Sequence, residues 1–267
     1  MNDLITQIID HEMLTTCQQM KNILSHSLIT KIEPSYCYYN SVNIAVGNQE
    51  SGKTFAMIRE MAKISRVSRN THLLIYANKT GGTTDKTFEA QKDKIHIPII
   101  YLSHDQLEDF LKEFLEWKEL YNEIHKNNLG DKIVEKQKKE LFERLHINDF
   151  SRPVLHTLIY IEDASETPIL KKKKSYIKEL MTQCRHINCS FFLIIHFWKA
   201  LEDPGIKTQV TTLSVFGGYC KQQITYILSQ IFTSADRDEV WANYKRLRKH
   251  EKMVIDSRAG TVKYNPP

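Results

Sequence analysis

The chain has 267 residues, of which 41% are hydrophobic and 26% are charged, and its net charge is +5 at pH 7. These values are typical of a globular protein with a buried core, and they exclude a wholly disordered chain. The net charge is compatible with a polyanionic partner, but many soluble enzymes have the same balance.

The cysteines and the N-terminus both bear on the compartment in which the protein is expected to reside. The five cysteines are scattered without a C-x-x-C pair, which favours reduced thiols in a cytosol-like compartment. The N-terminus lacks the order of a signal peptide. The longest apolar run, 191–195, is far shorter than the roughly 20 residues of a membrane helix. We therefore expect a soluble intracellular protein without membrane insertion.

The chain is expected to begin with an N-terminal helical extension over residues 1–40, because apolar residues recur there at near-helical spacing until Pro34. The second predicted domain covers residues 41–267. It opens with a short buried strand at Val42–Val46 and a helix at 55–67.

The segment between this strand and this helix matches G-x-x-x-x-G-K-[ST], the phosphate-binding loop of P-loop NTPases. Gly52 allows a close approach of the backbone to a nucleotide, Lys53 would reach the β- and γ-phosphates, and the hydroxyl of Thr54 would bind Mg²⁺. The predicted phosphate-binding residues are Gly47, Asn48, Gln49, Glu50, Ser51, Gly52, Lys53 and Thr54. A chance match in an ordinary turn is the weaker interpretation, because the strand and the helix lie on the correct sides of the loop.

The rest of the domain alternates between strands and helices. Strands are predicted at 73–76, 98–102, 155–161, 191–195 and 213–216, helices at 105–128, 132–145, 167–183, 222–232 and 235–247, and a terminal hairpin at 252–264. Residues 105–147 are expected to form a solvated helical insertion, and residues 221–265 the C-terminal helices and hairpin. The pattern predicts an α/β fold, with a mostly parallel sheet flanked by helices and a ligand site beyond the carboxyl ends of its strands.

Two acidic residues, Glu162 and Asp163, directly follow the strand predicted at 155–161. A P-loop enzyme needs one carboxylate there for the Mg²⁺ shell and often a second one for the attacking water. Side chains alternate along a strand, so the two acids should have different roles. We assign the metal-shell role to Glu162 and the water-activating role to Asp163. The reverse assignment and a plain acidic turn are the alternatives.

Arg185 and His196 flank the strand predicted at 191–195. His196 could orient the water or sense the γ-phosphate, and the alternative is a histidine hydrogen-bonded at the rim of the sheet. Arg185 could stabilise transition-state charge, within its own subunit or across an interface. Its alternative is a surface or structural arginine.

The order of these motifs over residues 41–218 resembles the genome-packaging ATPases of nucleocytoplasmic large DNA viruses and virophages, the poxvirus-type branch of the FtsK–HerA superfamily. The similarity rests on the loop 47–54, on the pair Glu162-Asp163, where relatives usually carry Asp-Glu or Asp-Asp, and on the segment 185–190. His196 stands at a sensor position that is often Gln in relatives. The resemblance implies a RecA-like core that uses ATP and Mg²⁺.

The same resemblance implies a homo-oligomeric ring that moves double-stranded DNA into a preformed capsid, with capsid proteins as partners. The protein would then lie in the host cytoplasm (virus factory) or in the virion. Two other functions stay open: a nucleotide-gated scaffold or export ATPase of the same superfamily, and a P-loop small-molecule kinase.

A DNA translocase must contact phosphates without regard to base sequence. The candidate residues are Lys79, Lys171, Lys172, Lys173, Lys174, Arg246 and Arg248. Each has the alternative of a solvated surface charge or a cation at a helix end. Thr83, Thr84 and Asp85 are candidates for a loop that lines the pore.

Overall fold

The computed structural model describes residues 35–267, apart from 83–84, 168–169, 171–174, 202, 233–235 and 267. Most of the predicted N-terminal extension, Thr83, Thr84 and the four lysines at 171–174 therefore lie outside the described residues. In the described part of the chain, eight strands form a single sheet in the order β3-β2-β4-β5-β1-β6-β7-β8. No helix in this part combines the length and the apolarity needed to cross a membrane.

The sheet is parallel from β3 to β6, and β7 and β8 continue it in antiparallel orientation. The strands are β1 (Val42–Val46), β2 (Thr71–Asn78), β3 (Ile99–Ser103), β4 (His156–Ile161), β5 (Cys189–Ile195), β6 (Val210–Phe216), β7 (Lys252–Asp256) and β8 (Thr261–Tyr264). Every residue of β1, β2, β4, β5 and β6 is buried, as expected for parallel strands that are covered on both faces. The predicted α/β class is confirmed, and the predicted hairpin forms the end of the same sheet.

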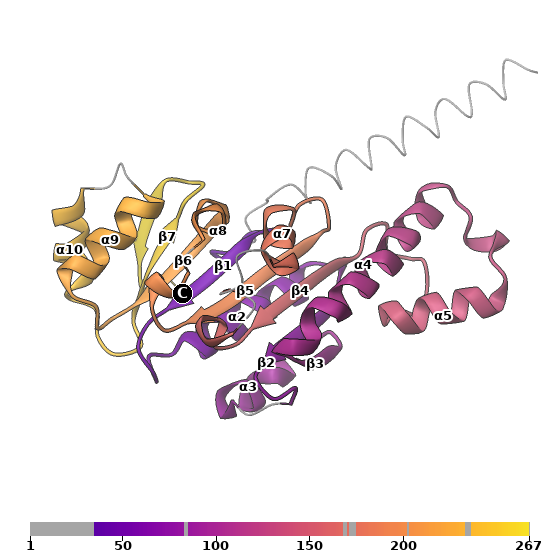
Figure 1. Cartoon of the computed structure of the whole chain (residues 1–267), viewed down its shortest axis with the longest axis horizontal. Coiled ribbons are helices and arrows are strands. Elements are labelled where there is room, and N and C mark those ends of the chain that lie inside the picture. Colours follow the sequence, from indigo (N-terminus) through magenta and orange to yellow (C-terminus); the bar gives the residue numbers. More distant parts are fainter. Residues whose placement is uncertain are drawn as a thin grey trace, which may run out of the picture.

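Helices cover both faces of this sheet (Figure 1). They are α2 (Lys53–Val67), α3 (Lys86–Gln91), α4 (His104–Lys126), α5 (Glu135–Leu145), α7 (Tyr176–Thr182), α8 (Pro204–Gln209), α9 (Lys221–Ile231) and α10 (Arg237–Tyr244). The apolar residues of α2 and α3 belong to one core cluster. Those of the other helices belong to a second cluster on the opposite face.

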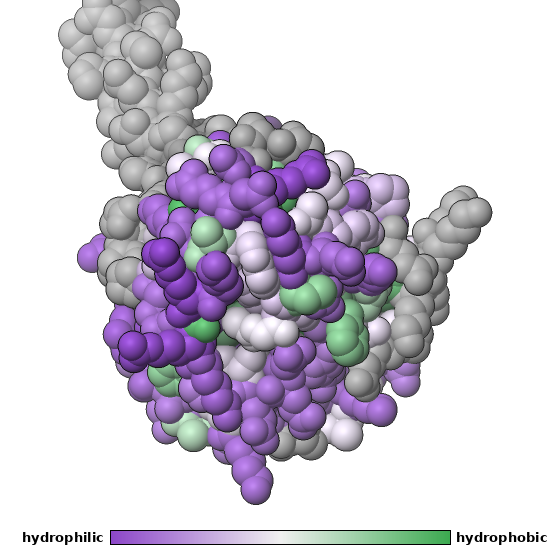
Figure 2. Space-filling view, turned by 90° about the vertical axis from the view of Figure 1, so that its left-hand side faces the viewer, coloured by the Kyte–Doolittle hydropathy of each residue, from purple (hydrophilic) through white to green (hydrophobic). Residues whose placement is uncertain are grey.

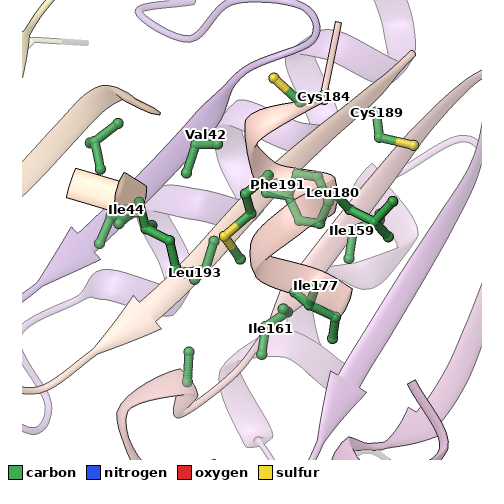
Figure 3. Packing of buried hydrophobic residues seen from close by; sticks show 14 of the residues in the cluster. Val42, Ile44, Ile159, Ile161, Ile177, Leu180, Cys184, Cys189, Phe191 and Leu193 are labelled. Atoms are coloured by element: carbon green, nitrogen blue, oxygen red, sulfur yellow. The ribbon is translucent and has the colours of Figure 1, made fainter. Parts of the chain in front are cut away.

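The larger core cluster fixes the central strands against α7 (Figure 3). Its members there include Val42, Ile44, Ile159, Ile161, Ile177, Leu180, Phe191 and Leu193. Alternate residues of β4, such as Leu158 and Tyr160, belong to the cluster on the other face. This alternation determines on which side of the sheet each residue after β4 emerges.

The predicted insertion at 105–147 is solvated only in part. Leu107, Leu111 and Phe114 of α4 are buried in the core cluster, so the first half of this long helix belongs to the α/β domain. α5 packs on the outer half of α4 and projects away from the sheet (Figure 1). The charge-rich sequence of α5 indicated a solvated helix correctly, but the apolar face of α4 covers the sheet.

Two short helices, α3 and α8, were not predicted, because six residues are too few for a helical period to be recognised. Each begins after an aspartate whose side chain accepts a hydrogen bond from the first turn, Asp85 in α3 and Asp203 in α8. Of the helix predicted at 167–183, the structure describes α7, which begins at Tyr176, whereas 168–169 and 171–174 lie outside the described residues.

Candidate nucleotide-binding site

The predicted phosphate-binding loop joins β1 to α2 at the carboxyl-terminal edge of the sheet. Gly52 has a φ of 95°, in the left-handed region. At Gly47, a Cβ atom would come within 2.8 Å of the Cβ of Phe216. Glycine is therefore required at both ends of the loop, by backbone conformation at one end and by close packing at the other. The strand–loop–helix context that the motif needs is present.

Lys53 points into this loop. Its side chain is buried, and Nζ donates hydrogen bonds to the carbonyl oxygens of Gly47 at 2.8 Å and Asn48 at 2.7 Å. Burial lowers the pKa of Lys53, and the carboxylate of Asp163 acts in the opposite direction. The ammonium group thus lies where a phosphate bound by the N–H groups of the loop would meet it.

The loop forms one wall of a cavity of about 780 Å³. Its other walls come from α2, from the start of α3 and from the C-terminal hairpin, and include Phe55, Arg59, Asp85, Thr87, Phe216, His250, Lys252, Asn265 and Pro266. Burial, followed by the nearby charge of Arg59, lowers the pKa of Lys252 to about 8. The volume is in the usual range for small-molecule sites. Sequence analysis did not foresee that the hairpin would border the phosphate-binding loop.

Glu162 and Asp163 leave β4 in different directions. Glu162 is 6% exposed and accepts a hydrogen bond from the hydroxyl of Tyr76 at Oε2. Asp163 has a φ of 46°, a half-exposed side chain and an electrostatic interaction with Lys53. Burial raises the pKa of Glu162 to about 8, and the carboxylates of Asp85 and Asp163 act in the same direction. These different surroundings fit the separate roles predicted for the two acids.

Thr54 and Asp85 lie on the Glu162 side of the sheet. Oγ1 of Thr54 is 3.4 Å from Oδ2 of Asp85. Asp85 also acts electrostatically on Glu162. Hydroxyl and carboxylate oxygens are the ligands that Mg²⁺ prefers, and Mg²⁺ usually needs few protein ligands because it keeps waters and binds substrate phosphates. Thr54 and Glu162 therefore fit the predicted metal site, although no group of three acidic, histidine or cysteine side chains suited to a metal occurs within the described residues.

Sequence reasoning missed the contribution of Asp85 to this site. The available signal was an acidic residue shortly after the strand end, at the cap of a helix. Asn78, the last residue of β2, shapes the turn that leads from this strand toward Asp85. Its Oδ1 accepts hydrogen bonds from the N–H groups of Thr80 at 3.0 Å and Gly81 at 2.8 Å. The strand length was underestimated, so the position of this turn could not be derived.

His196 directly follows β5, next to the end of β4. Its Nε2 lies 3.1 Å from Oδ1 of Asp163. Its backbone carbonyl accepts a hydrogen bond of 2.5 Å from the hydroxyl of Tyr219. The structure thus brings the predicted sensor residue into contact with the predicted water-activating carboxylate.

Arg185 lies at the opposite edge of the sheet. β1 and β5 are parallel, with Val42 beside Phe191 and Val46 beside Ile195, so Arg185 precedes the amino end of β5 while the phosphate-binding loop follows the carboxyl end of β1. Seven residues of strand separate the two edges, roughly 23 Å at about 3.3 Å per residue. A role for Arg185 in the site of its own chain is therefore wrong. A role across an interface stays a prediction.

Three candidate DNA-contacting residues lie at the same edge as the phosphate-binding loop. Lys79 is exposed after β2, and Arg246 and Arg248 are exposed between α10 and β7. β2 runs parallel to the neighbouring core strands, and β7 runs antiparallel to β6, so both segments are at the carboxyl edge. The side of the molecule with α9, α10 and the hairpin is largely hydrophilic, with isolated apolar groups (Figure 2). Contact with DNA stays a prediction.

The sheet order, the loop after β1 and the acids after β4 define an α/β chain with the RecA-like P-loop NTPase fold. No protein-family model and no curated sequence relative matches this chain. One similar solved structure is the genome packaging NTPase B204 from Sulfolobus turreted icosahedral virus 2 in complex with AMP. Its TM-score is 0.52 and its identity 15%, over 85% of this chain and 97% of B204.

ATPase domains of secretion proteins are also similar. EssC (ATPases 2 and 3) from Geobacillus thermodenitrificans has a TM-score of 0.54 and an identity of 12%, over 88% of this chain and 42% of EssC. The cytoplasmic domain of the Thermomonospora curvata Type VII Secretion ATPase EccC has a TM-score of 0.53 and an identity of 13%, over 84% of this chain and 25% of EccC. The chain therefore shares its fold with a viral packaging NTPase and with FtsK-like ATPase domains, and the resemblance predicted from the motifs is confirmed at the level of the fold.

Proposed function

We propose that this chain is an ATPase that uses Mg²⁺ and couples ATP hydrolysis to the movement of double-stranded DNA into a viral capsid. The observation that carries the proposal is the convergence of Lys53, Thr54 and the pair Glu162-Asp163 at one edge of the sheet. A buried ammonium, a hydroxyl and two carboxylates in different surroundings are the groups that phosphoryl transfer to water requires.

Each residue of the site has a separate task in this proposal. Lys53 would neutralise charge on the β- and γ-phosphates, and Thr54 and Glu162 would hold Mg²⁺. Bound Mg²⁺ supplies further neutralisation of phosphate charge. Asp163 would accept the proton of the attacking water, and the contact with His196 would keep its carboxylate in place.

DNA packaging is supported by the fold shared with B204, which extends over nearly the whole of B204. It is also supported by the exposed cations Lys79, Arg246 and Arg248 at the edge that carries the site. We further propose a homo-oligomeric ring, capsid proteins as partners, and the host cytoplasm (virus factory) or the virion as location. These proposals follow from the resemblance of the motifs to packaging ATPases.

An assembly or export ATPase is the second candidate, because EccC and EssC domains have the same fold at similar TM-scores. The small-molecule kinase is less well supported. Such an enzyme needs a lid over its phosphates, but α5, the charged helix of the predicted insertion, packs on the outer half of α4, far from the phosphate-binding loop (Figure 1).

The decisive experiment measures ATP hydrolysis with and without duplex DNA over a series of salt concentrations. We expect DNA to stimulate hydrolysis at low salt, and the stimulation to fall steeply as salt rises, because phosphate contacts release counterions. Lys53→Ala should lose hydrolysis, whereas Lys139→Ala, on the exposed face of α5, should retain it. Hydrolysis that ignores DNA at low salt would favour the export candidate, and phosphate transferred to a nucleoside acceptor would favour a kinase.

A further inference from the structure

Asp85 is held with one carboxylate oxygen on its own helix and the other toward the phosphate-binding loop. Oδ1 accepts a hydrogen bond of 2.8 Å from the N–H of Phe88 and thereby caps α3. Oδ2 lies 3.4 Å from Oγ1 of Thr54, and Asp85 lines the cavity of the loop. The hydrogen bond to α3 fixes the position of the carboxylate, and its second oxygen faces Thr54 as a result.

The hydroxyl of Tyr160 is a second, independent sign that a ligand belongs here. Tyr160 is fully buried, and its hydroxyl has no hydrogen-bond partner among the described residues. Burial raises the pKa of Tyr160, the carboxyl groups of Glu162 and Asp85 raise it further, and the nearby side chain of Thr54 lowers it. A buried hydroxyl without a partner costs free energy, unless a water or a ligand shell in the site satisfies it.

Two carboxyl groups lie near this hydroxyl. Neither Asp85 nor Glu162 forms a salt bridge within the part of the chain that the structure describes. Lys53 is directed to the loop carbonyls and interacts with Asp163. Two carboxyl groups and two hydroxyls form oxygen-rich surroundings that suit a hard divalent ion and its waters.

We infer that Asp85 is a second acidic residue of the magnesium site, a positioning residue that acts beside Thr54 and Glu162. This inference rests on the proposed function, because it takes Thr54 as the residue that meets the ion of a bound nucleoside triphosphate. Asp85 accepts hydrogen bonds from the water shell of the ion, and the Tyr160 hydroxyl completes the same shell. Residues that orient a metal shell in this way typically change metal affinity by about 10- to 100-fold when they are replaced.

The test measures Mn²⁺ binding, as a stand-in for Mg²⁺, by the electron paramagnetic resonance signal of free Mn²⁺ in the presence of a non-hydrolysable ATP analogue. Asp85→Asn is the informative variant, because asparagine is as good a helix cap as aspartate but carries no charge. We expect Mn²⁺ to bind at least about tenfold more weakly to this variant. Binding of the analogue without metal should be unchanged or tighter. Asp85→Ser, which also caps a helix, should behave in the same way.

Asp93→Asn is the matched control, since Asp93 is an exposed acid in the next turn of the same segment. It should leave Mn²⁺ binding unchanged. If Asp85→Asn binds Mn²⁺ as tightly as the unmodified chain does, the inference fails and the proposed function stands. If the unmodified chain binds the analogue neither with nor without Mn²⁺, the proposed function fails and takes the inference with it.

Discussion

The imidazole of His196 lies 3.1 Å from the carboxylate of Asp163, where the parallel strands β4 and β5 end side by side. Asp163 adopts a left-handed backbone conformation at this point, and its carboxylate interacts electrostatically with Lys53. The pair therefore links the end of β5 to a carboxylate that interacts with the lysine of the phosphate-binding loop. Both side chains remain partly exposed, so water can reach them.

Replacing Asp163 by Asn should separate nucleotide binding from turnover. The amide keeps the shape of the side chain but cannot accept a proton, so we expect kcat to fall roughly 10²- to 10⁴-fold. ATP affinity should stay close to that of the unmodified chain, because Lys53 and the loop are unchanged. Hydrolysis rates and binding of a fluorescent ATP analogue provide the two measurements. A variant with normal kcat would show that Asp163 does not activate water.

His196 should matter through its contact with Asp163. Loss of a hydrogen bond to a charged group costs about 1.5–3 kcal/mol, so His196→Ala should lower kcat by roughly 10- to 100-fold. His196→Gln retains a donor and should recover part of this loss. His96→Ala, at an exposed position outside the site, serves as the control. Equal rates for the alanine and glutamine variants would argue against the contact.

The central part of the fold could be predicted because its sequence signals are local. Buried parallel strands consist of short apolar runs, and the spacing from Gly47 to Thr54 matched the motif with a strand before it and a helix after it. The separate surroundings of Glu162 and Asp163 followed from alternation along β4. These relationships involve neighbours in sequence or the known edge of a parallel sheet.

The parts that could not be predicted depend on contacts between distant segments. Asp85 joins the site because β2 lies beside β4 and because Asn78 holds the turn that follows β2. His250 and Lys252 border the cavity because β7 pairs with β6 in antiparallel orientation. A role of Arg185 within its own subunit was one interpretation of its place before the sensor strand, but the direction of β5 puts Arg185 at the other edge of the sheet.

Acidification should destabilise the chain through two buried histidines. Burial, with help from the charge of Lys118, lowers the pKa of His72 to about 3, and burial lowers the pKa of His156 well below its ordinary value. Unfolded histidine titrates near pH 6.5, so below that pH the unfolded chain binds more protons than the folded chain. Stability should therefore fall as the pH drops from about 6.5 toward 3, by about 1.4 kcal/mol per pH unit for each histidine.

Urea unfolding between pH 7.5 and 5 measures this slope. His72→Asn should give a shallower dependence, because asparagine does not titrate and its amide can replace the donor that Nδ1 offers to the His156 carbonyl at 2.9 Å. His96→Asn should keep the original slope, since His96 is exposed. Identical slopes for His72→Asn and the unmodified chain would assign the pH dependence to other groups.

Lys118 should stabilise the turn that leads into β5. Its buried Nζ donates to the carbonyl oxygens of Ile187 at 2.8 Å and Asn188 at 3.0 Å, and to the hydroxyl of Thr157 at 3.1 Å. Lys118→Met keeps the length of the side chain but removes these three hydrogen bonds, at a cost of about 3–5 kcal/mol in unfolding free energy. Of the two carbonyls, that of Asn188 keeps a backbone donor, the N–H of Thr157 at 3.1 Å. Lys112→Met, on the exposed face of the same helix, is the control and should change the unfolding free energy little. If Lys118→Met weakens only nucleotide binding and not stability, this structural role is wrong.

Arg185 should act only between subunits, because it lies at the edge of the sheet opposite to the phosphate-binding loop. A head-to-tail ring brings different surfaces of neighbouring subunits together, and an arginine supplied across such an interface contributes roughly 10³- to 10⁵-fold to turnover. Arg185→Ala should therefore reduce hydrolysis of the assembled form and leave nucleotide binding intact. Mixing it with Lys53→Ala subunits should restore some activity, since each interface that pairs an intact loop with an intact arginine is functional. Arg237→Ala, a change at an exposed position at the start of α10, is the control and should hydrolyse ATP normally. If the mixtures of Arg185→Ala and Lys53→Ala subunits recover no activity, Arg185 has no role in hydrolysis.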